Sequence, residues 1–305
     1  MKKNNRFVFL MLLAITALSA TSCLKDTDGE KREEEKRLID NYLSVNNITV
    51  TPTTNGLYYI EQLQGTGASP VYGDFALIKF NGYDINGELF NTTDKALAEQ
   101  KKITPSFAIG GPYKIYMNGN YYLPGVLEGL TKMKEGGKAK MIMPSLLAYN
   151  DYVPRIFDVE LVKVISNPMA YEREQIANFL DTASTLEVKD STAAGLYYIE
   201  KLTGTADKFP ALGNTVKLKY KGYFPDGRVF DTNYDATDSL TFKIGDLSVI
   251  KGMDEGIRLM KKMGKGTLVI PYYRGYGFDQ LRSKNQVVIP YFSTLIFDIE
   301  LLDIK

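Results

Sequence analysis

The sequence contains no histidine and a single cysteine, Cys23. These two absences exclude catalytic triads built on histidine, zinc sites with histidine ligands, and disulfide bonds within the chain. General acid or base catalysis would have to use Asp, Glu, Lys or Tyr side chains. Chemistry that needs only an apolar pocket and hydrogen-bond donors remains open, and it requires neither a metal ion nor another cofactor.

A charge excess of either sign is also absent, because 37 basic residues stand against 36 acidic ones and leave a formal net charge of +1. This balance gives no reason to expect nucleic acid as a partner. The 44% hydrophobic and 24% charged residues are typical of a globular protein. A length of 305 residues fits two domains once a processing segment is removed.

The amino terminus is typical of a targeting segment. An apolar run over residues 7–20 is too short to span a bilayer comfortably, and it follows three basic residues, Lys2, Lys3 and Arg6. We therefore interpret residues 1–22 as a signal peptide.

Cys23 follows the small residues Ala20, Thr21 and Ser22, an arrangement that resembles the lipobox of bacterial lipoproteins. The resemblance implies a lipid on Cys23, anchorage to a membrane, and a place in the cell envelope as an outer-membrane lipoprotein, facing either the periplasm or the surface. The alternative is a free thiol beside an ordinary cleavage site. Residues 23–37 are mostly polar and are expected to form a solvated, lipidated tether.

A duplication divides the rest of the chain. The run GLYYIEQLQGT begins at Gly56 and GLYYIEKLTGT at Gly195, an offset of 195 − 56 = 139 residues. The offset persists to the far end, where FDVEL from Phe157 answers FDIEL from Phe297 at 297 − 157 = 140 residues. Each repeat is therefore a whole domain. We place domain one at residues 38–165 and domain two at residues 166–305.

Hydrophobic periodicity predicts an α+β fold for each domain. Alternation typical of half-buried strands occurs in three segments, Ala76/Ile78/Phe80, Val216/Leu218/Tyr220 and Leu295/Phe297/Ile299/Leu301. Helical spacing ahead of a glycine occurs once in each repeat, at Val126/Leu130/Met133 and at Met253/Ile257/Met260. A twisted antiparallel sheet wrapped on one short helix would bury these faces together.

Each domain is also expected to begin with a leader helix. Ser166 or Asn167 followed by Pro168 is typical of a helix start, and the run that follows places three apolar residues on one stripe, Ile176, Phe179 and Leu180. A similar helix is expected around Leu38 to Leu43. Pairing of two copies of the chain through these helices, which would give a homodimer, is left open.

The second repeat resembles the FKBP-type peptidyl-prolyl isomerase family over about residues 212–305. Four segments carry the resemblance, in order and at the family's spacing: YKGYFPDGRVFD from Tyr220, IGDLSVIKGMDEGI from Ile244, IPYYRGYG from Ile270 and VIPYFSTLIFDIELL from Val288. The resemblance implies two FKBP-like domains in tandem. It also implies a shallow apolar cleft that binds proline-containing polypeptides and isomerises their X-Pro bonds.

By position, the resemblance assigns catalytic roles to Tyr220, Phe230, Asp231 and Tyr276, and substrate binding to Val249, Ile250, Met253, Ile289 and Phe297. Taken singly, these residues have ordinary structural interpretations. Phe297 and Val249 would be core residues in almost any sheet, and Asp231 or Tyr276 could simply belong to turns. Only their joint spacing favours a site. Met253 stands where the family usually has a tryptophan.

Domain one departs further from the family pattern. Phe80 and Asn91 stand at the positions of Tyr220 and Asp231, without the hydroxyl and without the charge. The segment 149–157 spans 157 − 149 = 8 positions against 297 − 276 = 21 in domain two, so most of the family's flap is missing. Domain one instead adds a tyrosine-rich run, PYKIYMNGNYY from Pro112. We expect a degenerate domain that offers a reshaped binding or dimerising surface.

The sequence thus predicts a peptidyl-prolyl cis-trans isomerase that assists the folding of envelope or secreted proteins, with activity mainly in domain two. A different class of function competes with it, a non-catalytic binding or chaperone lipoprotein that holds other chains through exposed tyrosine-rich loops. A carboxylate-based hydrolase would need two acids facing one cleft, and no paired-acid motif stands out.

Overall fold

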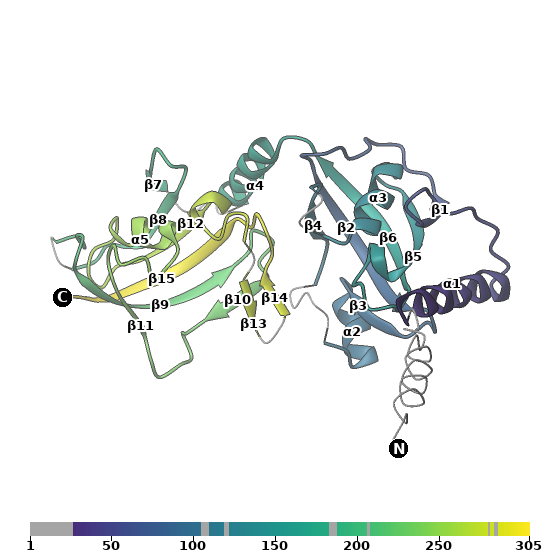
Figure 1. The fold of residues 1–305 in the computed structure, drawn as a ribbon. Helices are drawn as coiled ribbons and strands as arrows, with labels where there is room; N and C mark the ends of the chain where they lie inside the picture. Colours follow the sequence, from purple (N-terminus) through teal and green to yellow (C-terminus); the bar gives the residue numbers. More distant parts are fainter. Residues whose placement is uncertain are drawn as a thin grey trace, which may run out of the picture.

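The computed structural model describes residues 27–104, 110–118, 122–182, 188–205, 208–279, 281–283 and 286–305. The expected signal peptide and the expected lipidation site at Cys23 lie outside these ranges. Within them, no helix is both long and apolar enough to cross a membrane. Two sheets belonging to two domains lie side by side (Figure 1).

Domain one is built on an antiparallel sheet of six described strands. The strand order is β1-β5-β6-β2-β3, and β4 pairs with β2. Its elements are α1 (Thr27–Val45), β1 (Tyr58–Leu63), β2 (Phe75–Asp84), β3 (Leu89–Thr92), α2 (Lys95–Lys101), β4 (Tyr113–Tyr116), α3 (Pro124–Lys132), β5 (Lys138–Met143), the 3-10 helix η1 (Ser145–Leu147) and β6 (Arg155–Ile165).

Domain two repeats this plan with a sheet of seven described strands in the order β10-β9-β15-β12-β8-β7, and β11 pairs with β9. Its elements are α4 (Pro168–Thr182), β7 (Val188–Ser191), β8 (Tyr197–Leu202), β9 (Thr215–Tyr223), β10 (Val229–Thr232), β11 (Leu240–Lys243), α5 (Lys251–Ile257), β12 (Lys265–Ile270), the 3-10 helix η2 (Tyr272–Arg274), β13 (Leu281–Ser283), β14 (Gln286–Ile289) and β15 (Leu295–Ile304). The separate hairpin β13-β14 has no counterpart in domain one, where residues 150–154 alone connect Tyr149 to β6. The predicted loss of the flap is confirmed.

The predicted alternation and helical spacing are confirmed in both domains. On β9, Val216 and Leu218 are completely buried, and they pack in one cluster with Met253 and Ile257 of α5. In domain one, Ala76 and Ile78 of β2 belong to the cluster that contains Val126 and Leu130 of α3. One short helix therefore covers one face of each sheet, as the α+β interpretation requires.

The leader helices cover the opposite face of each sheet. Ile39 of α1 packs against Tyr58, Ile142 and Ile156, and Ile176 of α4 packs against Ile199, Val269 and Ile296. The apolar stripes of both helices are thus buried within the same chain. A homodimer through the leader helices, which the sequence left open, therefore gains no support from these stripes.

The start of α4 agrees with the sequence signal. Pro168 is the first helical residue, and the side-chain oxygen of Asn167 accepts a hydrogen bond from the N–H of Ala170 at 3.0 Å. An N-cap of this kind supplies an acceptor for a backbone donor that has no partner inside the helix.

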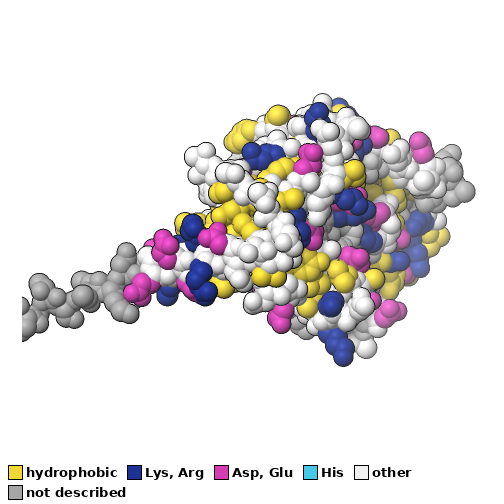
Figure 2. Space-filling view, turned by 90° about the vertical axis from the view of Figure 1, so that its right-hand side faces the viewer, with side chains coloured by type: hydrophobic (Ala, Val, Ile, Leu, Met, Phe, Trp, Pro, Cys, Tyr) yellow, Lys and Arg dark blue, Asp and Glu magenta, His cyan; other side chains and the backbone are white. Residues whose placement is uncertain are grey.

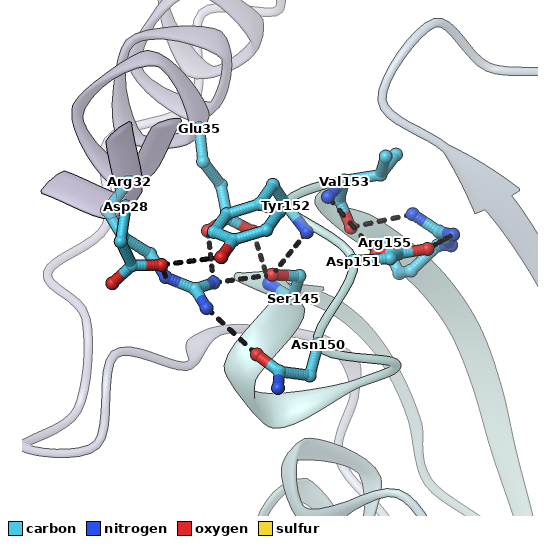
Figure 3. Close-up of polar contacts among 9 residues, drawn as sticks. All are labelled: Asp28, Arg32, Glu35, Ser145, Asn150, Asp151, Tyr152, Val153 and Arg155. Atoms are coloured by element: carbon cyan, nitrogen blue, oxygen red, sulfur yellow. Dashed lines mark hydrogen bonds and ion pairs between the residues drawn. The ribbon is translucent and has the colours of Figure 1, made fainter. Parts of the chain in front are cut away.

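The prediction of a solvated tether over residues 23–37 is wrong for residues 27–37, because α1 already begins at Thr27. Acidic and basic side chains lie along the N-terminal part of this helix, as Figure 2 shows, but its inner side is docked on domain one. Arg32 donates to the hydroxyl oxygen of Ser145 at 2.8 Å and to the side-chain oxygen of Asn150 at 2.8 Å. Charged hydrogen bonds anchor this helix where apolar residues are scarce (Figure 3).

Candidate functional site

A cavity of about 390 Å³ opens on domain two between the sheet, α5 and the hairpin β13-β14. Its described lining consists of Tyr220, Phe230, Asp231, Leu240, Ser248, Val249, Ile250, Met253, Tyr276, Leu281, Val288, Ile289 and Phe297. All nine site residues predicted in this domain are in that set. The sequence analysis did not assign Leu240, Ser248, Leu281 and Val288 to the site. Periodicity gave no signal for Leu281 and Val288 on the bulged hairpin, whereas Ile289 of the same hairpin was assigned by its position in the family motif.

Different elements bring the lining residues together. Tyr220 comes from β9, Phe230 and Asp231 from β10, and Phe297 from β15, and these three strands are neighbours in the sheet. Ile250 is the N-cap residue of α5, and Met253 lies in its first turn. Tyr276 follows η2, and Ile289 ends β14. Residues up to 77 positions apart, from Tyr220 to Phe297 (297 − 220), thus meet at one site.

The floor of the cavity is apolar and aromatic. Met253, Ile289 and Phe297 are buried, and the ring of Phe297 meets that of Phe230 edge-on with 5.5 Å between centroids. Gly222 of β9 makes this arrangement possible, because a Cβ atom there would lie only 2.5 Å from the Phe230 ring. Such a floor accepts an apolar ring and offers it no hydrogen bond.

A hydrogen-bonded pair forms the polar rim of the cavity. The hydroxyl of Tyr220 donates to the carboxylate of Asp231 at 2.5 Å. Burial, and then this hydrogen bond, raise the pKa of Tyr220 well above its ordinary value. Burial likewise raises the pKa of Tyr276, with the nearby charge of Asp231 as a further cause. Both phenols therefore keep their protons at neutral pH and remain hydrogen-bond donors.

The chemistry of this lining is limited to binding and orienting. Asp231 is the single carboxylate among the described lining residues, and the lining includes one serine, Ser248, with no histidine or lysine to activate it. Two acids facing one cleft, which a carboxylate hydrolase needs, are not found in this set. The cavity fits an apolar ring attached to a polar backbone.

The corresponding place in domain one is packed with aromatic rings. Phe157 is completely buried and lies 5.4 Å from Phe80 and 5.8 Å from Phe90, measured between ring centroids. The guanidinium of Arg155 covers Phe90 and Tyr149, at 5.4 Å and 5.2 Å from their ring centroids. Phe80 and Phe157 are therefore core residues, while Phe90 packs against them and Tyr149 is exposed at the edge.

Asn91, the counterpart of Asp231, lies in a different environment from that of Asp231. Asn91 is buried, and its side-chain oxygen accepts the backbone N–H of Thr92 at 3.0 Å. Asp231 is exposed by contrast. The polar pair of domain two therefore has no equivalent in domain one, as the sequence predicted.

The tyrosine-rich run from Pro112 does not form exposed loops where it is described. Tyr113 is buried on β4, which pairs with β2, and Tyr122 packs against it at 5.9 Å between centroids. Tyr116 packs against Phe75 at 5.1 Å and, across the domain boundary, against Phe292 at 5.4 Å. The expected exposed surface for partners is wrong for these tyrosines, because they pack within the chain.

Comparison with known proteins agrees with the geometry. The family model of the FKBP-type peptidyl-prolyl cis-trans isomerases matches residues 67–186 and 206–302. The chain is 35% identical over 127 residues to the FKBP-type peptidyl-prolyl cis-trans isomerase FkpA of Buchnera aphidicola subsp. Schizaphis graminum. The matched region covers 42% of this chain and 48% of that protein. It is 39% identical over 110 residues to the FK506-binding protein of Neisseria meningitidis serogroup C. This match covers 36% of this chain and 97% of that protein.

The crystal structure of FkpA from Escherichia coli is also similar, with 31% sequence identity and a TM-score of 0.35, and the match covers 45% of this chain and 62% of that chain. The chain spans about half the length of the Buchnera protein.

Proposed function

The chain belongs to the FKBP-type peptidyl-prolyl cis-trans isomerase family, and from that membership we propose that its domain two catalyses the isomerisation of X-Pro bonds in polypeptides folding in the cell envelope. The observation that carries this proposal is the cavity of domain two, in which an apolar floor lies beside one tyrosine–carboxylate pair. Its lining includes all nine residues that the family resemblance implies.

The reaction suits a site without a nucleophile. An X-Pro bond isomerises over a barrier of ~18 to 20 kcal/mol because the amide loses its conjugation when it twists. The twisted amide is less polar than the planar one, so its transfer out of water costs less free energy. A cavity that holds the prolyl ring and excludes water from the amide therefore favours the transition state over the ground state.

Each part of the cavity has a role in this proposal. Phe230, Met253 and Phe297, together with Val249, Ile250 and Ile289, form the slot for the prolyl ring. The hydroxyl of Tyr276 and the backbone N–H of Ile250 donate hydrogen bonds to the backbone of the bound chain. Asp231 and Tyr220 hold each other at the rim and keep the entrance polar.

Domain one takes no part in the chemistry. Its aromatic residues pack together under Arg155, and Asn91 is buried rather than placed at a rim. Its role is structural.

The test is the rate of a proline-limited refolding reaction, which takes tens to hundreds of seconds unassisted. The chain from Leu24 onward should accelerate it. Asp231→Ala and Tyr276→Phe should each reduce the acceleration about fivefold, the size expected for the loss of one hydrogen bond. Tyr149→Phe, the same change at the matching position of domain one, is the control and should leave the rate unchanged.

The result also decides between two classes of protein. A non-catalytic binding or chaperone protein would slow the refolding reaction or leave its rate unchanged. If the wild-type chain gave that outcome, the non-catalytic binding protein would replace the isomerase as the proposed function. The described tyrosines of that run, Tyr113, Tyr116 and Tyr122, pack within the chain, which weakens this second candidate.

The location in the envelope rests on the sequence of the first 23 residues. A basic start, an apolar run and a cysteine after three small residues support a signal peptide and a lipid on Cys23. Expression of the full chain in a Gram-negative host should place it in the outer-membrane fraction with a fatty-acid label. Cys23→Ala should lose both the label and the membrane association, and a label that persists in this variant would contradict the proposal.

A further inference from the structure

The segment between Tyr276 and β15, here called the flap, contacts two different partners. It is described at residues 277–279, 281–283 and 286–294, and it carries the hairpin β13-β14. Leu281, Val288 and Ile289 of the flap line the cavity of domain two. Val287, between them, is completely buried and belongs to the apolar cluster of domain one. The hairpin reaches toward domain one, as Figure 1 shows.

A β-bulge explains how neighbouring residues face two ways. Leu281 pairs with Ile289, but the next residue, Arg282, pairs with Val287, so one extra residue is inserted in β14. A bulge re-aims side chains relative to regular alternation. Val288 and Ile289 therefore both line the cavity while Val287 inserts into domain one.

Aromatic residues of domain one also enclose the base of the flap. Phe292 is buried, and its ring lies 4.1 Å from that of Phe75 and 5.4 Å from that of Tyr116, both in domain one. The backbone of Phe292 has a positive φ of 57°, and its N–H donates to the carbonyl of Gly277 at 3.0 Å. A side chain of this size adopts that conformation only where its surroundings impose it.

One cation of domain one adds a directed contact. The ammonium group of Lys114 on β4 donates to the carbonyl of Phe292 at 2.8 Å. It also lies 5.9 Å from the ring centroid of Phe75, so it belongs to the same aromatic cluster. A charged donor on a backbone carbonyl fixes the position of that peptide more firmly than apolar contact does.

The structure assigns to domain one the role of a fixed support for the flap, with Lys114 as a positioning residue for the cavity of domain two. An isolated two-stranded hairpin has little stability of its own in water. Docking on domain one orders the hairpin before any polypeptide binds. Binding of the polypeptide therefore does not include the entropy cost of ordering the hairpin. The inference rests on the proposed function, and it assigns to the non-catalytic domain one a role in substrate binding by domain two.

The effect should appear in substrate affinity rather than in the chemical step. The flap contacts a bound chain in the ground state and in the transition state alike, while the slot residues on the sheet and α5 stay in place. Loss of uniform binding raises KM and leaves kcat unchanged. Lys114→Met, which keeps length but removes the donor, should raise KM for a proline-containing peptide about fivefold.

Lys163→Met is the matched control. Lys163 lies over the ring of Tyr171 at 5.2 Å, as Lys114 does at 5.8 Å, and its side chain is exposed. Lys163 forms no hydrogen bond or ring contact with the flap residues that the structure describes, so KM should not change. Val287→Ala tests the same support from the flap side and should raise KM in the same direction as Lys114→Met.

Hydrogen–deuterium exchange of the chain from Leu24 onward provides a readout independent of catalysis. Lys114→Met and Val287→Ala should speed exchange at the backbone amides of residues 286–294, and Lys163→Met should not. If the wild-type chain does not accelerate isomerisation, the proposed function is wrong. The role of domain one as a support for the flap is then tested by the Kd of the same peptide in place of KM. Unchanged affinity in both Lys114→Met and Val287→Ala, with or without faster exchange, would overturn the inference.

Discussion

The side chain of Glu172 holds the backbone of Tyr272, since its Oε1 atom accepts the Tyr272 N–H at 2.6 Å. The same oxygen accepts a hydrogen bond from the hydroxyl of Thr294 at 2.9 Å, so one buried carboxylate of α4 joins η2, ahead of Tyr276, to the last residue of the flap. Glu35 of α1 accepts the N–H of Ser145 in the same way in domain one. Each leader helix therefore fixes the 3-10 turn of its own domain.

Replacement of Glu172 tests this relationship. Glu172→Ala leaves two donors without their acceptor in a buried place, and each such loss costs about 1–3 kcal/mol. We expect the free energy of unfolding, measured by urea denaturation, to fall by about 2–3 kcal/mol. Isomerase activity should fall as well, because η2 leads directly to Tyr276.

Glu174→Ala is the control for helix propensity and charge, since Glu174 is exposed on the same helix. It should change the free energy of unfolding by less than about 0.5 kcal/mol. Equal losses in the two variants would show that the contact with Tyr272 contributes nothing.

The leader helices also show where sequence reasoning succeeds and where it stops. Ile176 and the Asn167–Pro168 start predicted α4, because both signals are local. The extent of α1 was missed, because its docked side is held by Arg32 and Glu35, and charged residues in a polar run are ordinarily assigned to solvent. Only the partner atoms on Ser145, far along the chain, decide that Glu35 is buried.

The site follows the same rule. The spacing of family motifs found nine residues of the cavity, and the structure brings them together from β9, β10, β14 and β15, from the start of α5 and from the segment after η2. Leu281 and Val288 were missed because a bulge sets their direction. The contact of Val287 with domain one was missed because it joins the two repeats, and periodicity within one repeat carries no information about that.

Lys114 should give the stability of the chain a distinct pH dependence. Burial lowers its pKa from 10.5 to about 8. Between these values the unfolded chain holds a proton that the folded chain has released, so the free energy of unfolding rises with pH from about 8 to about 10.5. A neutral amine still donates to the carbonyl of Phe292, so the contact survives this change.

Urea denaturation at several pH values across that window checks the sign. The free energy of unfolding of the wild-type chain should rise relative to that of Lys114→Met as the pH increases, because methionine has no proton to release. Groups common to both chains cancel in the difference. A difference that stays constant with pH would mean that Lys114 titrates as an ordinary exposed lysine.

Gly222→Ala should disturb the floor of the cavity. The new Cβ atom would lie 2.5 Å from Phe230 and 3.0 Å from Phe297, so one or both rings must move. Overpacking of this kind costs about 1–3 kcal/mol of stability, and here it also narrows the slot for the prolyl ring. The acceleration of proline-limited refolding should fall by about tenfold, as expected for a change of ~1.4 kcal/mol in transition-state binding.

Gly82→Ala makes the same change in domain one. Its Cβ atom would lie 3.0 Å from Phe90. Some stability of domain one should be lost while the refolding acceleration stays near that of the wild-type chain. A similar loss of acceleration in both variants would place part of the catalytic site in domain one.

Met253 forms the floor where the family usually has a tryptophan, and its contribution can be separated from general stability. Met253→Ala removes a buried side chain and should cost about 2–5 kcal/mol. It also widens the slot, so the prolyl ring loses contact on one side and the refolding acceleration should drop. Met253→Leu keeps the side-chain volume, so it should retain most of the refolding acceleration and lower the free energy of unfolding by less than about 1.5 kcal/mol.

Met260→Ala is the matched control, because Met260 is completely buried just beyond α5 and is not among the described residues lining the cavity. It should lose stability comparable to that lost by Met253→Ala while keeping the activity of the folded protein. Activity is therefore compared in the absence of denaturant, with the folded fraction of each variant measured by circular dichroism. If the two alanine variants lost activity equally per folded molecule, Met253 would be an ordinary core residue and the other five slot residues would have to hold the prolyl ring without it.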